Sequence, residues 1–265
     1  MKRIILILLI SHTALISNAQ DRVFARVYQS NVLGKNNKDL EVWNTYSFGR
    51  DYFYTKLHQR FEFEIGLSSK LQTSIYLNRE QVTQGNSVRE TSGSNSVSSE
   101  WKYKLSDPVA NGIGFALYGE FTASTDELEL EGKLIFDKKI RRSLLAFNVV
   151  YENEMEFEYE KEEGKTELES EEVKLEFDLG YMYDLKKGFR LGVEIKNDNI
   201  FEKGKWMNSP LFAGPTLSYG AERWWIIFNV LPQVINLKKE DGVIDNLELH
   251  DHEMYDLRLL FAYNF

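Results

Sequence analysis

The sequence predicts an all-β protein, a closed antiparallel transmembrane β-barrel of about 12 strands. Large apolar residues alternate with polar residues over most of the chain, and period two is the pattern of a β-strand. The face opposite the charged one is apolar on nearly every strand, which suits lipid rather than water. An open sheet edge in hydrocarbon would leave backbone groups unpaired, so the sheet is expected to close.

The composition agrees with a barrel. Aromatic residues make up 14 % of the chain and there are 4 prolines, while the mean hydropathy is only −0.40. A barrel shows lipid only every second residue, so its average hydropathy stays low. With no cysteine, disulfides and thiolate metal sites are excluded. The net charge of −9 argues against nucleic acid as a partner, and no cofactor motif is present.

The first 19 residues predict a secretory signal peptide. Lys2 and Arg3 precede a short apolar core at 4–10, and Ala19 ends a stretch of small residues suited to cleavage before Gln20. An uncleaved anchor is the alternative, but the apolar core is shorter than the roughly twenty residues that a helical span needs. No later segment approaches a helical span.

Residues 20–38 are predicted to be a periplasmic N-terminal segment ahead of a barrel at 39–265. The segment holds a short apolar patch at 23–28, followed by polar turn residues. We expect a disordered leader, with a periplasmic arm or a small plug as the alternatives.

The first half of the barrel is expected to contain six strands. Each alternates large apolar residues with polar or small ones, and the one at 57–65 does so most cleanly, with Phe61 and Phe63 set against Glu62 and Glu64. These strands are expected at 40–48, 57–65, 71–78, 101–105, 113–121 and 128–136.

The second half is expected to contain six more. Strands seven and eight alternate past the length that a membrane requires, so they are interpreted as a hairpin rising above the bilayer, and Pro215 weakens strand ten. These strands are expected at 144–159, 173–183, 191–196, 211–219, 224–230 and 255–265.

The connections alternate in length, which is typical of outer-membrane barrels with short periplasmic turns and longer external loops. Long polar loops are expected at 80–99, 197–209 and 238–251. The short connection at 124–126 is the exception to this alternation, because a long loop is expected there. An even number of strands returns both ends of the barrel to the periplasm.

The last stretch, Tyr255 to Phe265, puts large apolar residues on one face, with Leu260 as the exception on the other. It resembles the terminal strand of Gram-negative outer-membrane β-barrels, which commonly ends in Phe. The resemblance implies an outer-membrane location, lipid contact and recognition of this strand by the barrel-assembly machinery. The last strand of a soluble β-sandwich is the alternative.

The opening of the barrel, at 39–43, 61–67 and 71–78, resembles an uncharacterised family of bacterial barrel proteins described as transporters or porin-like. That family often has a Leu-Pro-Lys-Gly-like turn before the first strand, where this chain has Leu33-Gly34-Lys35-Asn36. The resemblance implies a barrel and says little about its cargo.

The inward faces carry charges of both signs. They predict a polar lumen that passes small hydrophilic solutes with a mild preference for cations. A ladder of interior ion pairs that fills the barrel is the alternative, because about eight strands are filled and about sixteen leave a channel. The residues predicted to line the lumen are Arg60, Glu62, Glu64, Lys102, Lys104, Glu120, Glu129, Glu131, Lys133, Glu176, Asp178, Arg190, Glu194, Asp256 and Arg258.

Two further clusters of charged or titratable residues are candidate sites. The acidic hairpin at 152–172 could collect cations, or it could be a solvated hairpin that protects an exposed edge. His250, Asp251, His252 and Glu253 form a rim cluster that could bind an ion or serve a hydrolase, or could simply start a polar strand. The His-x-Ser-Asn-Gly setting of the barrel phospholipase is absent.

The sequence therefore predicts a narrow porin or transporter for small polar or cationic solutes, without a catalytic residue, metal or cofactor. A rim-active outer-membrane hydrolase, protease-like or lipase-like, is one alternative. A structural or adhesive barrel that binds a partner through its external loops is the other.

Overall fold

The computed structural model describes residues 22–160, 165–238 and 246–265. The predicted signal peptide at 1–19 lies outside these residues. In the described parts of the chain, no helix is long and apolar enough to cross a membrane.

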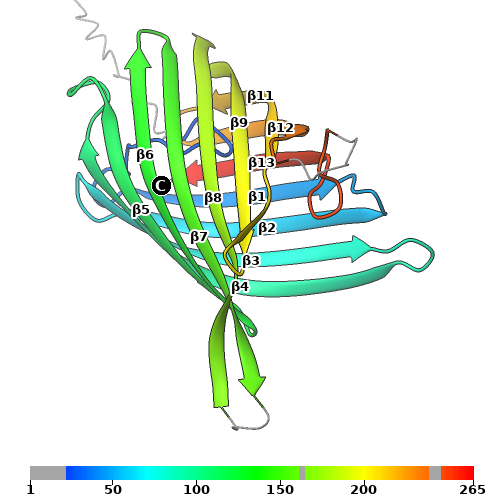
Figure 1. Ribbon diagram of the computed structural model, residues 1–265. Coiled ribbons are helices and arrows are strands. Elements are labelled where there is room, and N and C mark those ends of the chain that lie inside the picture. Colours follow the sequence, from blue (N-terminus) through cyan, green and yellow to red (C-terminus); the bar gives the residue numbers. More distant parts are fainter. Residues whose placement is uncertain (1–21, 161–164, 239–245) are drawn as a thin grey trace, which may run out of the picture.

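Twelve strands close into one antiparallel ring (Figure 1). β1 pairs with both β2 and β13, and β11 joins β9 to β12, while the short β10 pairs only with β9. The predicted closed barrel of about 12 strands is thus confirmed. The strands are β1 (Lys38–Phe48), β2 (Tyr54–Gly66), β3 (Leu71–Gln84), β4 (Glu90–Ser106), β5 (Gly114–Ala123), β6 (Glu127–Ile140), β7 (Ser143–Glu160), β8 (Lys165–Lys186), β9 (Phe189–Glu202), β10 (Lys205–Asn208), β11 (Pro210–Gly220), β12 (Trp224–Asn236) and β13 (Tyr255–Asn264).

Two predicted long loops are wrong. Most of 80–99 continues β3 and β4 as a paired hairpin, in which the hydroxyls of Thr83 and Thr91 hydrogen-bond at 3.0 Å. Likewise, most of 197–209 belongs to the end of β9 and to β10. The β3–β4 extension lacks the apolar alternation of a lipid-facing strand because both of its faces meet water, yet its backbone still pairs. The segment 197–209 also pairs, but Asp198, Ile200 and Asn208 within it are buried.

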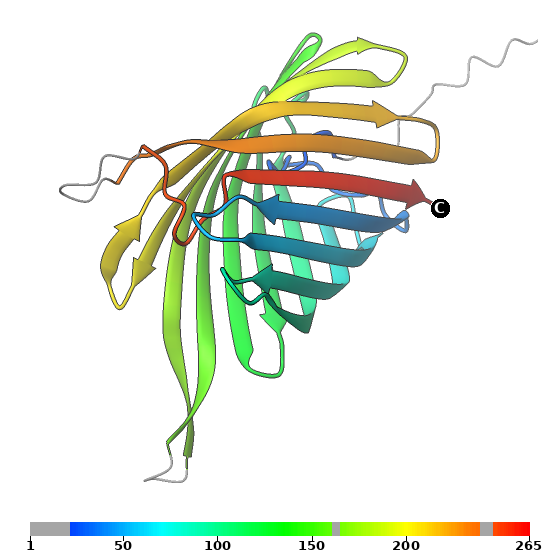
Figure 2. The same cartoon turned by 90° about the vertical axis from the view of Figure 1, so that its right-hand side faces the viewer.

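The two ends of the barrel differ as predicted. Near the C-terminus, β6 and β7 are joined by Arg141 and Arg142 alone, and β8 and β9 by Lys187 and Gly188 alone. At the other end the β3–β4 and β7–β8 hairpins project well beyond the ring (Figure 1), and Figure 2 shows the β7–β8 hairpin from a second side. The sequence placed the second of these hairpins correctly.

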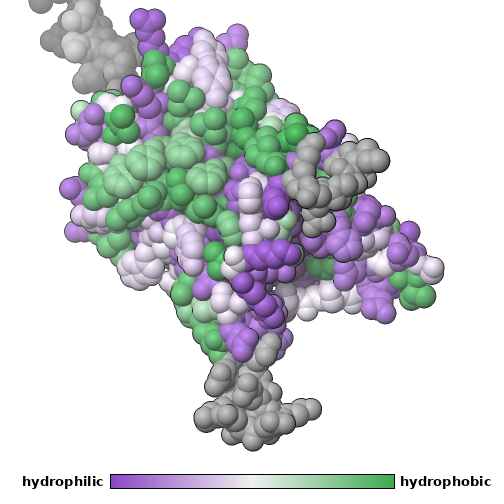
Figure 3. All heavy atoms as spheres, viewed as in Figure 1, coloured by the Kyte–Doolittle hydropathy of each residue, from purple (hydrophilic) through white to green (hydrophobic). Residues whose placement is uncertain are grey.

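The outer surface carries a belt of exposed apolar side chains, seen as a green band in Figure 3. On β13 the outward residues Leu259, Phe261 and Tyr263 are each about two-fifths exposed, whereas Leu260 and Ala262 point inward and are fully buried. Hydrophilic residues gather on the hairpin extensions. This arrangement is that of a barrel wall surrounded by lipid.

The belt makes a testable prediction. Leu259→Arg puts a charge in the lipid-facing wall, so we expect its free energy of unfolding from vesicles to fall by about 2–4 kcal/mol. Val88→Arg is the control, because Val88 is 74 % exposed in the β3–β4 turn. Urea unfolding of both variants measures the difference, and equal loss of stability would contradict a lipid-facing belt.

The described part of the N-terminal segment, from residue 22 onward, is ordered and is not the disordered leader that was expected. Residues 22–33 run inside the ring as an irregular chain, and Phe24, Ala25 and Val27 are fully buried (Figure 1). We call residues 22–33 the plug. Of the expectations for 20–38, the small plug is therefore the one that the described residues match.

The plug packs on apolar residues of the inner wall. One cluster joins Ala25 and Tyr28 to wall residues, and a second joins Phe24 to others. Leu260, the exception in the alternation of the last strand, belongs to the first cluster. The wall residues of the two clusters are Trp43, Ala116, Tyr118, Ile135, Leu144, Ala146, Met182, Trp225, Ile227, Leu260 and Ala262.

Candidate solute pathway and its plug

The plug is held at its centre by one carboxylate. Glu194 on β9 is fully buried and accepts hydrogen bonds from three successive backbone N–H groups of the plug, those of Ala25 (2.9 Å), Arg26 (2.6 Å) and Val27 (2.9 Å). The Thr216 hydroxyl donates a fourth at 2.6 Å. A carboxylate that accepts four hydrogen bonds fixes the path of the chain around it.

Side-chain amides fix the next residues. Asn148 on β7 pairs with Tyr28 in both directions: the Tyr28 N–H donates to Asn148 Oδ1 at 2.6 Å, and Asn148 Nδ2 donates to the Tyr28 carbonyl at 3.0 Å. Further along, the Leu33 N–H donates to Gln72 Oε1 at 2.8 Å. An irregular buried chain needs such partners for its backbone groups, because it has no strand neighbour to supply them.

Charged groups complete the attachment. Arg26 forms a buried ion pair with Asp256 of β13 at 2.7 Å. The guanidinium of Arg258 donates to the Ala25 carbonyl at 3.2 Å, and that of Arg22 lies 4.3 Å from the ring centroid of Trp43 on β1. The plug is therefore anchored to strands on several sides of the ring.

On the side of the plug away from the C-terminus lies a vestibule of about 390 Å³. Its wall is polar and more acidic than basic: Lys56 and Arg60 face several carboxylates. The vestibule carboxylates are Glu80, Glu127, Glu129 and Glu154.

The vestibule continues into a deeper chamber of about 190 Å³, which shares His58, Arg60 and Glu129 with it. Arg26 and Tyr28 of the plug form part of its wall. The charges here are mixed and closely paired: Arg60 lies 3.4 Å from Glu120, and Lys133 lies 3.0 Å from Glu131.

A third cavity, of about 220 Å³, lies on the other face of the plug. Val23, Gln29 and Asn31 line it together with Asp184 and Arg190 of the wall. Plug residues thus border both the deep chamber and this third cavity, and the plug separates them.

The predicted lumen residues occupy several settings. Those that line the deep chamber are Arg60, Glu120, Glu129, Glu131, Lys133, Glu176 and Arg258. Arg190 lines the third cavity, and Lys104 contacts Asp107 (3.7 Å) at a turn near the C-terminal end. Glu194 and Asp256 hold the plug, and Glu62, Glu64, Lys102 and Asp178 are buried in the inner wall.

The sequence reading missed the plug-binding role of Glu194, Asn148 and Gln72. An available signal was the set of small or apolar residues at inward positions of the wall, such as Ala116, which an open polar lumen would not need.

The rim cluster does not form the strand start that was expected. Residues 250–253 lie in a loop before β13, and their side chains take different partners. His250 faces Asp51 at 3.6 Å, His252 contacts Asn208 at 2.9 Å, and Glu253 lies 3.9 Å from Arg50. The cluster does not converge on one point, as a shared ion or a catalytic site would require.

This loop makes a prediction about pH. Burial, followed by the positive charges of Lys196 and Arg50, lowers the pKa of His252 to about 3. The unfolded value is about 6.5, so protonation favours the opened loop, and its stability falls below that pH by up to about 1.4 kcal/mol per pH unit. The protection factors of amides in 246–254, which are corrected for the intrinsic pH dependence of exchange, should therefore fall as the pH drops below about 6.5. His252→Gln should remove that dependence and His250→Gln should keep it, whereas equal profiles for all three proteins would contradict the assignment.

One family model matches residues 16–265, nearly the whole chain, and its description is "Family of unknown function (DUF6662)". The chain belongs to this family. No curated protein matches it significantly in sequence.

Solved structures with the same architecture are outer-membrane barrels. An outer membrane channel from Pseudomonas putida F1 has a TM-score of 0.61 at 10 % identity, over 89 % of this chain and 98 % of that one. The β domain of the Bordetella autotransporter BrkA gives 0.54 at 8 % identity, over 87 % and 100 %. The NanC porin gives 0.50 at 13 % identity, over 84 % and 98 %. At these identities the likeness shows the fold, that of an outer-membrane β-barrel.

Proposed function

We propose that this protein is a channel of the Gram-negative outer membrane for small polar solutes, closed or narrowed by its N-terminal plug. The observation that carries the proposal is the pair of polar cavities inside the ring, the vestibule and the deep chamber, with the plug between the deep chamber and the third cavity. The fold likeness to an outer membrane channel and a porin supports it.

The lining favours small, hydrophilic solutes. The vestibule is acidic, so it would concentrate cations at the mouth. The deep chamber sets Arg60, Lys133 and Lys174 beside carboxylates, so it offers hydrogen-bond donors and acceptors of both signs to a polar molecule. An apolar solute would find few partners there.

The acidic mouth predicts ion selectivity. In a salt gradient, we expect the reversal potential of the open channel to favour cations, and Glu127→Gln together with Glu154→Gln to reduce that preference, because both carboxylates line the vestibule. Glu222→Gln is the control, since Glu222 is exposed in the β11–β12 turn at the opposite end.

Swelling of proteoliposomes in small neutral sugars tests solute passage separately from ion flow. The proposal would be supported if vesicles that contain the barrel swell in these sugars and vesicles without it do not. Vesicles that hold folded barrels, including barrels with a released plug, and yet exclude every small solute would contradict it.

A further inference from the structure

A row of acidic residues crosses the inner wall near the plug. In the strand register Asp39 lies opposite Glu64, Ser74 lies between Glu64 and Glu100, and Glu100 lies opposite Glu120. Like charges that face each other across neighbouring strands destabilise a sheet. Something must therefore offset the repulsion along this row.

On one part of the wall, lysine and arginine do so. Glu120 has Arg60, and the row continues through β6 and β7 with Glu131 beside Lys133 and Glu152 beside Lys174 at 2.7 Å.

On β1, β2 and β4 the compensation is incomplete. Glu62 and Glu100 are each only 1 % exposed. Among the described residues, Glu62 Oε2 and both carboxylate oxygens of Glu100 have no hydrogen-bond partner. Burying a carboxylate without a partner is among the most expensive arrangements in a protein, so these oxygens point to a missing ligand.

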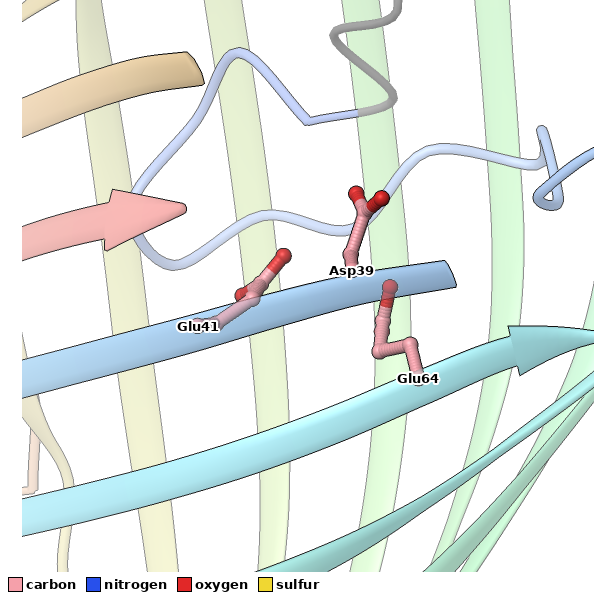
Figure 4. A group of neighbouring side chains, drawn as sticks. All are labelled: Asp39, Glu41 and Glu64. Carbon is pink, nitrogen blue, oxygen red and sulfur yellow. The ribbon is translucent and has the colours of Figure 1, made fainter. Parts of the chain in front are cut away.

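The oxygens converge as ligands of one ion would. One carboxylate oxygen each from Glu62, Glu64 and Glu100 all lie within 4.8 Å of one another. A second group with the same spacing, Asp39, Glu41 and Glu64, shares Glu64, and Figure 4 shows its three side chains rising from β1 and β2 on the same side. Oxygens at 2.3–2.6 Å from a calcium ion are separated by distances of this order.

We propose that this cluster is a divalent-cation site of the calcium class, with Glu62, Glu64 and Glu100 as its primary ligands. The donors are all carboxylate oxygens, which hard cations prefer and soft metals do not. Asp39 and Glu41 complete the negative environment on the far side of Glu64. Among the residues that the structure describes, Glu62, Glu64 and Glu100 have no lysine or arginine nitrogen within ion-pair distance, so the ion supplies the close positive charge there.

The site also touches the plug through one residue. Gln72 Nε2 donates to Glu64 Oε1 at 3.2 Å, while Gln72 Oε1 accepts the Leu33 N–H. The ion therefore links the carboxylates of β1, β2 and β4. Through Glu64 and Gln72 it also stabilises the end of the plug.

The test starts from the full chain refolded either with EDTA or with CaCl₂ and then desalted. Atomic emission should find about one calcium per folded barrel after refolding in calcium, with a higher melting temperature than the EDTA sample. Terbium is a second probe, because Trp43 Nε1 donates to Glu41 Oε2 at 2.7 Å and the indole is close enough to sensitise terbium luminescence.

Glu62→Gln and Glu100→Gln should each weaken terbium and calcium binding at least about tenfold and abolish the calcium-dependent rise in melting temperature. Glu131→Gln, in the same row beside Lys133, should leave both unchanged. Wild-type protein that binds no calcium and melts identically in EDTA would overturn the site. Binding that Glu131→Gln weakens as much as Glu100→Gln would overturn the choice of ligands. The wild-type result decides even where a variant fails to fold.

Discussion

Glu194→Ala is expected to release the plug. The change leaves the N–H groups of Ala25, Arg26 and Val27 and the hydroxyl of Thr216 without their acceptor in a buried place. Each such group costs about 1–3 kcal/mol, so docking of the plug should weaken by at least about 3 kcal/mol. Trypsin should then cut after Arg22 and Arg26 in the folded barrel, at sites that are buried in the wild type.

Glu202→Ala is the matched control, because Glu202 belongs to the same strand but is exposed. Its plug should resist trypsin as the wild type does. If Glu194→Ala resists equally, the hydrogen bonds to this carboxylate do not hold the segment.

Gly180→Leu is expected to displace the plug by a different route. A Cβ at Gly180 would lie 2.7 Å from Cε1 of Phe24, whose ring is fully buried. Because this is a close contact with a buried ring, the extra side chain should destabilise docking by about 1–3 kcal/mol. Two measurements report the effect: the rate at which a protease cleaves the plug, and the hydrogen-exchange protection of the backbone amides around Phe24.

Phe24→Ala provides the decisive comparison. Combined with Gly180→Leu, it removes the clash, and the double variant should recover much of the protection that Gly180→Leu loses. Gly119→Leu is the control, since a Cβ there meets no atom within 4 Å. A double variant as sensitive as Gly180→Leu alone would show that this contact is not the cause.

The barrel was predictable because the pattern that marks each strand, apolar residues alternating with polar ones, lies within the strand itself. Lipid outside and polar groups inside impose period two on every crossing, so the strands around Phe61 and Leu259 could be placed from alternation alone. The β3–β4 extension at 80–99 was missed because a hairpin surrounded by water has no apolar face. Its pairing depends on backbone bonds that composition does not reveal.

The plug was less predictable because its attachments join residues far apart in the chain. In the sequence, Glu194 and Asn148 look like ordinary polar residues that face the inside of a barrel. Only the folded structure places them beside residues 25–28. The same holds for Glu62 and Glu100, which alternation places inside the barrel but only the register of β2, β3 and β4 brings together. By contrast, residues 250–253 are adjacent in sequence, and the fold directs their side chains to different partners.

The central claim is that the plug controls a polar channel, and single-channel conductance in a planar bilayer tests it most directly. Wild-type protein should give small or infrequent steps, and Glu194→Ala should give steps that are several-fold larger and longer, with Glu202→Ala like the wild type. Folded Glu194→Ala protein whose plug is open to trypsin but whose conductance does not exceed that of the wild type would contradict the account.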